Sequence, residues 1–281
     1  MRASPVIVER GVVGLLWIMA ALTVGVLLFI IVYILVHGVP HITSQFLTES
    51  PRDMGRGGGV LPMIVATAMV AGLGVLIAAP VGVATAIYLT EFTREGRVTR
   101  IIRFGADCLA GIPSIIFGLF GFVFFCITLG LGYSVIAGAL TLALMVLPTI
   151  IRTSEEAIRA VPYSYREVSY GVGSTRWQMV THVVLRSALP GIATGVVLST
   201  ARCIEETAVL MLTVGGALRM PTSLFDPCRP LSLHFYILAR EGISWPKAFA
   251  TASVLIIAVL LINLFAYWLM RRFATQGARH G

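Results

Sequence analysis

Three ionisable residues stand close together in a long apolar stretch of this chain. Arg202, Glu205 and Glu206 fall about the middle of residues 191–214, a stretch long enough to cross a membrane as a helix. A charge inside a membrane costs several kcal/mol unless it is paired or faces water, so these side chains must avoid lipid. Arg202 and Glu206 are four residues apart, which places them on one helical face and within reach of an ion pair.

This ion cluster has two interpretations. In the first, the pair is structural and only neutralises itself. In the second, both side chains face a polar pathway, where Arg202 supplies positive potential to an anion and Glu206 holds Arg202 in place when the pathway is empty. Ionisable residues inside membranes are functional by default, so the sequence favours the pathway.

The chain carries no recognisable catalytic motif. A phosphate-binding P-loop needs a lysine that follows glycine and precedes Ser or Thr, whereas the sole lysine, Lys247, follows Pro246. Neither the GxSxG nor the HExxH pattern occurs, and the four cysteines lack the Cys/His spacing that holds zinc. We therefore expect no catalytic residue, no metal site and no cofactor bound by this chain.

Composition places the chain among integral membrane proteins. Hydrophobic residues make up 57% of the sequence and charged residues only 12%, outside the range of soluble domains. A helix needs about 20 apolar residues to cross the bilayer. That rule predicts an all-α protein, a single membrane domain over residues 1–281, with six transmembrane helices at about residues 12–36, 63–89, 101–127, 133–151, 191–214 and 248–270.

One long uncharged stretch must turn back on itself. No charged residue occurs from Cys108 to Ile151, which is too long for a single crossing. We expect a hairpin of two helices there, with its turn at Gly130 and Gly132.

The distribution of positive charge sets the orientation. With both termini in the cytoplasm, most of the 21 Lys and Arg residues fall on the cytoplasmic side, as membrane proteins prefer. The polar, Arg-rich segment 152–190 then becomes a cytoplasmic loop, whose expected role is to dock a soluble partner. Because membrane topology explains the net charge of +8, the expected surroundings are membrane lipid, and nucleic-acid binding is not expected.

Two further polar residues are expected to be structural. Asp107, near the cytoplasmic end of the third span, could cap a helix, reach the interface or pair with Arg103 on the preceding turn. His234 and Tyr236 belong to a segment of mixed polarity that suits a short helix on the outer mouth. His234 is expected to be a surface residue there.

The cytoplasmic loop resembles the membrane subunits of ATP-binding-cassette importers. Their shared motif reads Glu-Ala-Ala, three residues, Gly, nine residues, Ile, one residue, Leu-Pro, and the register here is Glu167, Gly173, Val183 and Leu185. Val and Ser replace the two alanines, and Arg186 replaces the proline. The resemblance implies two short helices with the glycine at their turn, where it supplies backbone freedom, and insertion into a cleft of an ATPase subunit.

Other stretches are similar to the permeases of phosphate importers, and specifically to the PstA type. They are AGIPSIIFGLFG at 110–121, RTSEEAIRAVP at 152–162, ETA at 206–208 and the outer segment 221–242. The resemblance implies a type I importer permease fold, phosphate transport and location in the cell (inner or plasma) membrane. The implied partners are a PstC-like permease, two copies of an ATPase subunit that holds ATP and Mg²⁺, and an extracytoplasmic phosphate-binding protein.

The resemblance also bears on the ion cluster. In that family the fifth span commonly reads Arg-Ala-Ile-Gly-Glu-Thr-Ala, and its Arg and Glu, which are implicated in phosphate passage, correspond to Arg202 and Glu206. Glu205 stands where the family has glycine. A carboxylate facing the pathway would oppose an anion, so Glu205 is expected to point toward another helix or to be held protonated.

Alternative functions remain open from sequence. The nearest is a permease of the same type for another oxyanion, such as molybdate or sulfate. An ion-coupled secondary carrier would use Arg202 and Glu206 as a relay and need no ATPase. A membrane enzyme acting on lipid phosphates ranks last, because no clustered His/Arg/Asp set is apparent in the sequence.

Overall fold

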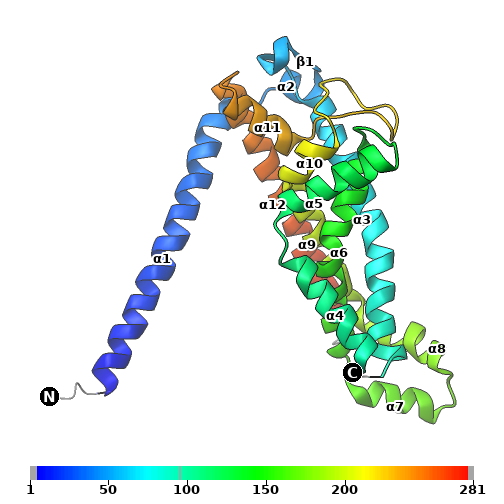
Figure 1. The fold of residues 1–281 in the computed structure, drawn as a ribbon. Coiled ribbons are helices and arrows are strands. Elements are labelled where there is room, and N and C mark those ends of the chain that lie inside the picture. The colour runs from blue at the N-terminus through cyan, green and yellow to red at the C-terminus, as the bar shows by residue number, and fades with distance from the viewer. Residues whose placement is uncertain (1–4, 95, 278–281) are drawn as a thin grey trace.

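The computed structural model describes residues 5–94 and 96–277, and this part of the chain is mainly helical (Figure 1). The all-α prediction is confirmed. A small outer hairpin pairs β1 (Pro51–Arg52) antiparallel with β2 (Gly57–Gly58). The α-helices are α1 (Pro5–Gly38), α2 (Ser44–Thr48), α3 (Leu61–Ile87), α4 (Arg97–Ala110), α5 (Ser114–Gly121), α6 (Val135–Arg159), α7 (Tyr163–Gly171), α8 (Arg176–Met179), α9 (Leu185–Glu205), α10 (Ala208–Thr213), α11 (Leu231–Arg240) and α12 (Trp245–Gly277).

Irregular helical turns extend several of these elements. The π-helical segments η3 (Tyr88–Phe92), η4 (Phe122–Thr128) and η5 (Val180–Val184) follow α3, α5 and α8. The short 3₁₀ segments η1 (Val39–His41) and η2 (Asp53–Gly55) lie near the outer hairpin. Because η5 joins α8 to α9 without a break, the chain is helical from Arg176 to Glu205.

Within the described residues, five helical segments are long and apolar enough to cross a membrane: Val12–His41, Leu61–Phe92, Val135–Arg159, Arg176–Glu205 and Trp245–Phe265. Helix α4 together with α5 and η4 passes the same test of length and apolarity as a pair, but the pair is bent by 100° between Ala110 and Ser114, the geometry of a broken span or a re-entrant loop. The prediction of six spans is met when this bent pair counts as one. The bend interrupts the third span expected at residues 101–127, since Pro113 lacks a backbone N–H and disfavours helical geometry at the residue before it.

The predicted turn of the long uncharged hairpin is confirmed. Gly130 and Gly132 have φ values of +69° and +61°, a left-handed conformation that glycine adopts without strain. They connect η4 to α6, which begins with Ser134 accepting a hydrogen bond from the N–H of Ala137 as its N-cap.

The segment expected to form a cytoplasmic loop, residues 152–190, is mostly helical in the structure. Helix α6 continues to Arg159, and helical structure resumes at Arg176, so α7 and two short connections are all that lie between. Two local interactions extend these helices past the apolar spans. Arg159 pairs with Glu155 at 2.8 Å one turn back, and Thr175 and Gln178 form a capping box at the start of α8.

The core lies where α3, α6 and α9 pack against one another. Small residues allow this close approach, as is common between membrane helices. Gly82 of α3 faces Ile150 of α6, and Gly195 of α9 faces Thr153 of α6, with no room for a further methyl group at either glycine. Leu142 and Ile150 are fully buried in this core.

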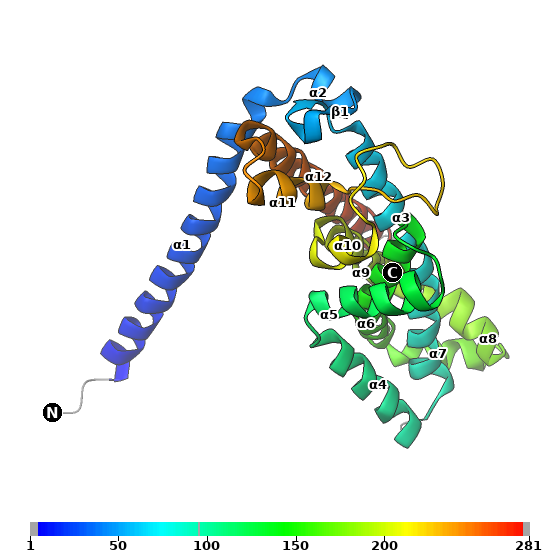
Figure 2. The same cartoon turned by 45° about the horizontal axis from the view of Figure 1, so that its top comes forward.

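Helix α1 stands apart from the other helices except near its outer end (Figure 1 and Figure 2). There the hydroxyl of Ser253 in α12 donates to the carbonyl of Ile34 at 3.2 Å, and Gly38 lies against the backbone of Phe249. Along most of its length the apolar side chains of α1 are exposed, including Trp17 and Phe29. Among the described residues, the span Val12–His41 is therefore left unburied over most of its length.

The two ends of the molecule carry different structures. Helices α7 and α8 lie at the end where α1 begins, whereas α2, β1 and α11 lie at the opposite end, which the predicted orientation would place outside the cell (Figure 1). The short helix predicted around His234 is present as α11. The expectation that His234 lies on the surface is wrong, because this side chain is only 1% exposed and lies against Gly55.

Candidate functional site

The three residues of the ion cluster meet at the C-terminal end of α9. Arg202 donates from Nη1 to Oε1 of Glu205 at 3.1 Å, and its Nη2 lies 3.3 Å from Oε2 of Glu206. The predicted ion pair between Arg202 and Glu206 is therefore confirmed. Both contacts lie within one helical turn, as the spacing of three and four residues requires.

The expected position of the cluster in mid-helix is wrong. Helix α9 ends at Glu205, and Glu206 adopts an extended backbone with ψ of 129° before α10 begins at Ala208. The physical reason is the Glu206 carboxylate, whose Oε1 accepts hydrogen bonds from the N–H groups of Ala208 and Val209 at 3.1 and 3.4 Å. It thus satisfies backbone donors at the start of α10 that a continuous helix would have paired internally.

Glu206 also connects the break between α9 and α10 to helix α11. Its side chain is 4% exposed, and its backbone carbonyl accepts a 2.7 Å hydrogen bond from the hydroxyl of Ser232 in α11. The N-terminus of α11 is held on α3 as well, where the N–H of Leu231 donates to Thr67 at 2.9 Å. The position of Arg202 is therefore set by a residue that is itself fixed on two sides.

Arg202 and Glu205 project from an open face of α9. Their side chains are 52% and 47% exposed, and Leu198, one turn earlier, shares that face. The opposite face, with Cys203 and Ile204, is buried. Glu205 pairs with Arg202 on its own helix. One guanidinium thus serves two carboxylates, of which one is fixed and one is half exposed.

The second candidate region is the coupling elbow, defined here as α7, the turn around Gly173, and α8. Two short helices with glycine at their turn are what the motif predicts, and Gly173 has φ of +82°. Glu167 is exposed on α7. Large apolar side chains of the elbow are exposed as well, namely Tyr163, Val168, Val172 and Trp177.

The remaining motif residues lie at the base of the elbow rather than on its surface. Val183 and Leu185 are half buried where η5 runs into α9. Leu185 packs against a cluster of buried residues that includes Ile158 and Met179. The motif thus combines two exposed positions that can touch a partner with two that fix the elbow to the membrane helices.

Sequence reasoning missed a buried ion pair beneath the elbow. Glu91, at the end of α3 and η3, is 7% exposed and pairs with Arg166 of α7 at 2.6 Å. The signal in the sequence was a carboxylate next to the end of an apolar span. Glu91 and Arg166 are 75 positions apart, and their spacing does not indicate that they meet.

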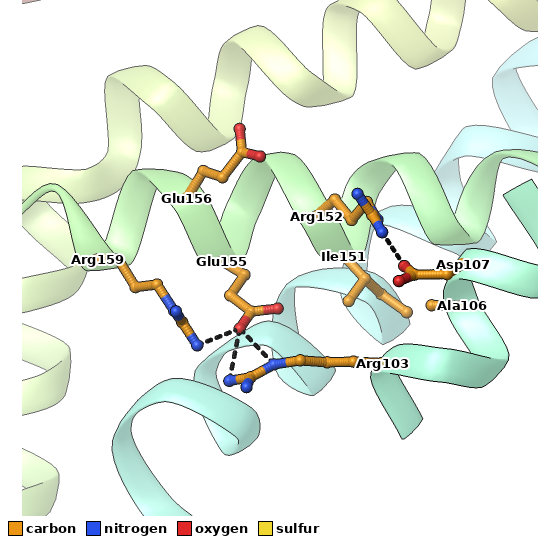
Figure 3. Close-up of a pocket in the computed structure, with 8 residues that line it drawn as sticks. All are labelled: Arg103, Ala106, Asp107, Ile151, Arg152, Glu155, Glu156 and Arg159. Carbon is orange, nitrogen blue, oxygen red and sulfur yellow. Dashed lines mark hydrogen bonds and ion pairs between the residues drawn. The ribbon is translucent and has the colours of Figure 1, made fainter. Parts of the chain in front are cut away.

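A hollow of about 250 Å³ lies between α4 and α6 near the same end (Figure 3). Glu155 pairs with Arg103 and with Arg159, each at 2.8 Å, and Asp107 pairs with Arg152. Asp107 is thus structural, as predicted, and its partner here lies on α6. The Arg103–Glu155 and Asp107–Arg152 pairs connect α4 to α6, and we assign the hollow no ligand.

Metal chemistry finds no support in the geometry. Among residues 5–94 and 96–277, no three His, Cys, Asp or Glu side chains come together in a group that could hold a metal ion. The four cysteines are free thiols, with Cys126, Cys203 and Cys228 buried and Cys108 exposed.

Comparison with known sequences identifies one family. Residues 78–276 match the family described as "Binding-protein-dependent transport system inner membrane component". The "Probable ABC transporter permease protein YqgI" of Bacillus subtilis (strain 168) is 32% identical over 280 residues, 94% of this chain and 95% of that protein. The "Phosphate transport system permease protein PstA 1" of Mycobacterium tuberculosis (strain H37Rv) is 37% identical over 79% of this chain and 72% of that protein. PstA of Xylella fastidiosa (strain Temecula1) is 34% identical over 84% and 83%.

Solved structures share the fold. The MetNI methionine ABC transporter in inward facing conformations has a chain that matches with a TM-score of 0.59 and 23% identity, over 76% of this chain and 94% of that chain. A bacterial alginate ABC transporter in complex with its periplasmic protein matches with a TM-score of 0.65 and 17% identity, over 91% and 94%. The arrangement of helices is therefore that of an ABC importer permease.

Proposed function

Because the chain belongs to the family of binding-protein-dependent transport system inner membrane components, we propose that it is the permease subunit of an ATP-driven importer of inorganic phosphate. The observation that carries this proposal is the 34–37% identity to PstA permeases over most of the chain. The chain is a transport subunit and not an enzyme. ATP and Mg²⁺ belong to the separate ATPase.

The open face of α9 is the proposed lining of the translocation pathway. A phosphate anion that leaves water needs compensating hydrogen-bond donors, and Arg202 supplies a guanidinium whose planar donors suit phosphate oxygens. The buried carboxylate of Glu206 keeps that guanidinium in place. Glu205 competes with the anion for Arg202, and because both side chains are half exposed, this ion pair is weak enough to be exchanged.

The coupling elbow is the proposed docking site for the ATPase. It lies at one end of the molecule, and it exposes Glu167 together with apolar and aromatic side chains such as Val168 and Trp177. Contacts of this kind, a polar group within an apolar patch, suit insertion into a cleft. ATP-driven closure of two ATPase subunits would then move the elbow, and only contacts that differ between the inward and outward states can shift their populations.

The remaining partners follow from the same assignment. A PstC-like permease would complete the pathway, and an extracytoplasmic phosphate-binding protein would deliver the anion to the outer end. This arrangement places residues 1–281 as one permease domain in the cell (inner or plasma) membrane, with both termini and the elbow in the cytoplasm. Selection among anions falls to the binding protein, since one arginine between two carboxylates offers little discrimination.

Reconstitution tests the proposal. The chain, a PstC-like permease, the ATPase and the binding protein are placed in proteoliposomes, and uptake of labelled phosphate, sulfate and molybdate is measured with and without ATP. We expect ATP-dependent uptake of phosphate. Uptake of sulfate or molybdate in its place would reassign the substrate, and transport by this chain alone under an ion gradient would make it a secondary carrier.

A further inference from the structure

Side chains of the coupling elbow bind the cytoplasmic end of α3 through hydrogen bonds and an ion pair. Oε1 of Glu91 accepts hydrogen bonds from Arg166 of α7, at 2.6 Å from Nη2 and 3.2 Å from Nε. The two side chains are 7% and 12% exposed, so this pair is largely removed from water. Breaking a buried pair leaves an uncompensated charge and is far more costly than losing a surface pair.

Arg166 also holds the end of α6. Its Nη1 donates to the carbonyl of Val161 at 2.8 Å, and its Nη2 donates to the carbonyl of Ile158 at 3.1 Å. Carbonyls at a helix C-terminus lack intrahelical partners and carry partial negative charge, so a guanidinium suits them. One side chain of the elbow therefore joins α7 to the ends of both α3 and α6.

The second helix of the elbow, α8, also contacts η3, at Glu91 and Phe92. The guanidinium of Arg176 in α8 donates to the backbone carbonyl of Glu91 and lies 5.2 Å from the centre of the Phe92 ring. The ring of Trp177 is 6.4 Å from that of Phe92. Glu91 thus holds α7 through its carboxylate and α8 through its backbone, while Phe92 adds aromatic contacts with α8.

This Glu91 clasp, defined as Glu91 with Arg166 and Arg176, lies on an irregular part of its helix. Residues Tyr88–Phe92 form a π-helical turn at the end of α3, and such turns are frequent at functional positions in helices. Upstream of that turn, α3 packs closely along α6, with Gly74 and Gly82 against it. A displacement of the elbow consequently has a direct mechanical connection to the two central helices of the core.

We propose that Glu91 is a positioning residue for energy coupling: it transmits movement of the elbow to α3. The inference rests on the proposed function insofar as the ATPase moves the elbow. Its physical content is that the elbow and α3 move as one body, because separating them would leave Arg166 without its carboxylate in a buried site.

The test is Glu91→Gln in the complete reconstituted importer. Glutamine keeps the shape of the side chain and removes its charge. We expect assembly and ATP hydrolysis to persist while anion molecules transported per ATP fall about tenfold, within the range usual for coupling between sites. Glu91→Asp, which retains the charge, should recover most of the loss.

Glu155→Gln is the matched control. Glu155 is also a buried carboxylate with two arginine partners near the same end, but Arg103 and Arg159 lie on α4 and α6 and not on the elbow. This control should keep the wild-type transport ratio. Normal coupling in Glu91→Gln, or an equal loss in Glu155→Gln, would overturn the proposal.

A second measurement does not depend on the transported anion. Amide hydrogen exchange over residues 84–92 of the assembled complex should speed up in Glu91→Gln and stay at the wild-type rate in Glu155→Gln. Unchanged exchange in Glu91→Gln would also count against the clasp. If the wild-type importer carries sulfate rather than phosphate, the substrate assignment fails while both measurements still decide the role of Glu91.

Discussion

The ion cluster on α9 and the Glu91 clasp both pair arginine with glutamate, yet they are built in opposite ways. The cluster is local, with Arg202 three and four residues from its partners, and half of it is exposed. The clasp joins residues 75 positions apart and is nearly dry. An exposed pair can exchange one partner for a passing anion at little cost, whereas a buried pair resists separation. The first therefore suits transient binding, and the second suits transmission of force.

The variant Arg202→Gln tests most directly whether the exposed ion cluster binds the transported anion. If Arg202 compensates the charge of the passing anion, its loss should lower phosphate uptake on the order of 100- to 1000-fold, as the loss of one donor to a charged intermediate does elsewhere. Uptake of labelled phosphate and co-purification of the subunits are measured together. Wild-type uptake in the variant would leave Arg202 with a structural role only.

Glu205→Gln is the matched variant for that experiment. It removes the half-exposed competitor of the anion and leaves the buried Glu206 in place. Uptake should stay at or above the wild-type rate. A loss as large as that of Arg202→Gln would show that Glu205 is required and does not compete.

His234 shows the effect of burial on a single ionisable side chain, which tertiary packing removes from water. Burial, with a smaller contribution from Arg229, lowers the pKa of His234 from 6.5 to about 4. The folded protein thus keeps the ring neutral while the unfolded chain takes up a proton as pH falls below 6.5. This contribution to stability is complete above pH 6.5 and is lost progressively toward pH 4, to a total of about 3 kcal/mol.

Thermal unfolding at pH 7.5 and pH 5 measures this effect. The wild-type melting temperature should fall at pH 5, and His234→Gln should remove most of that pH dependence. His182→Gln, at an exposed histidine beside the elbow, should leave it unchanged. Equal pH dependence in all three proteins would rule out His234 as its source.

Close packing of α3 on α6 provides the next test. A Cβ at Gly82 would lie 2.7 Å from Ile150, whereas a Cβ at Gly72 on the same helix would meet nothing within 4 Å. We expect Gly82→Val to destabilise the protein by about 1–3 kcal/mol through overpacking, and Gly72→Val to change stability by much less. Thermal unfolding in one detergent compares the two, and equal effects would contradict the assignment of this interface to the core.

The smallest expected effect is at the turn of the elbow. Gly173 has φ of +82°, where a Cβ costs roughly 1–2 kcal/mol, although it would meet no atom of this chain. Gly173→Ala should weaken binding of the ATPase about tenfold, because the turn must adopt the strained conformation to present Glu167. Gly171→Ala has no such strain and serves as the control. Equal affinities in a pull-down titration would remove the turn from the docking surface.

Local chemistry was predictable from the sequence where the partners lie within one or two helical turns. The helices themselves, the glycine turn after η4, the Arg202–Glu206 pair and the glycine of the elbow all follow from apolar length, helical spacing or backbone freedom. The sequence marks Pro113 as an interruption of its apolar run but does not give the 100° bend found there. The break after Glu205 was not predicted. In an uninterrupted apolar stretch, length alone does not say whether a helix is straight.

By itself the sequence determined a membrane-spanning helical protein whose polar motif lies at one end and whose charged cluster lies on one helix, because composition and periodicity are properties of neighbouring residues. Only the tertiary structure decided that Glu206 caps α10, that His234 is buried and that Glu91 meets Arg166. Those outcomes depend on which segments, distant in the sequence, pack together and exclude water. Packing sets how far each ion pair is buried. The degree of burial decides whether an arginine can exchange its carboxylate for an anion, as at Arg202, or keeps it, as at Arg166.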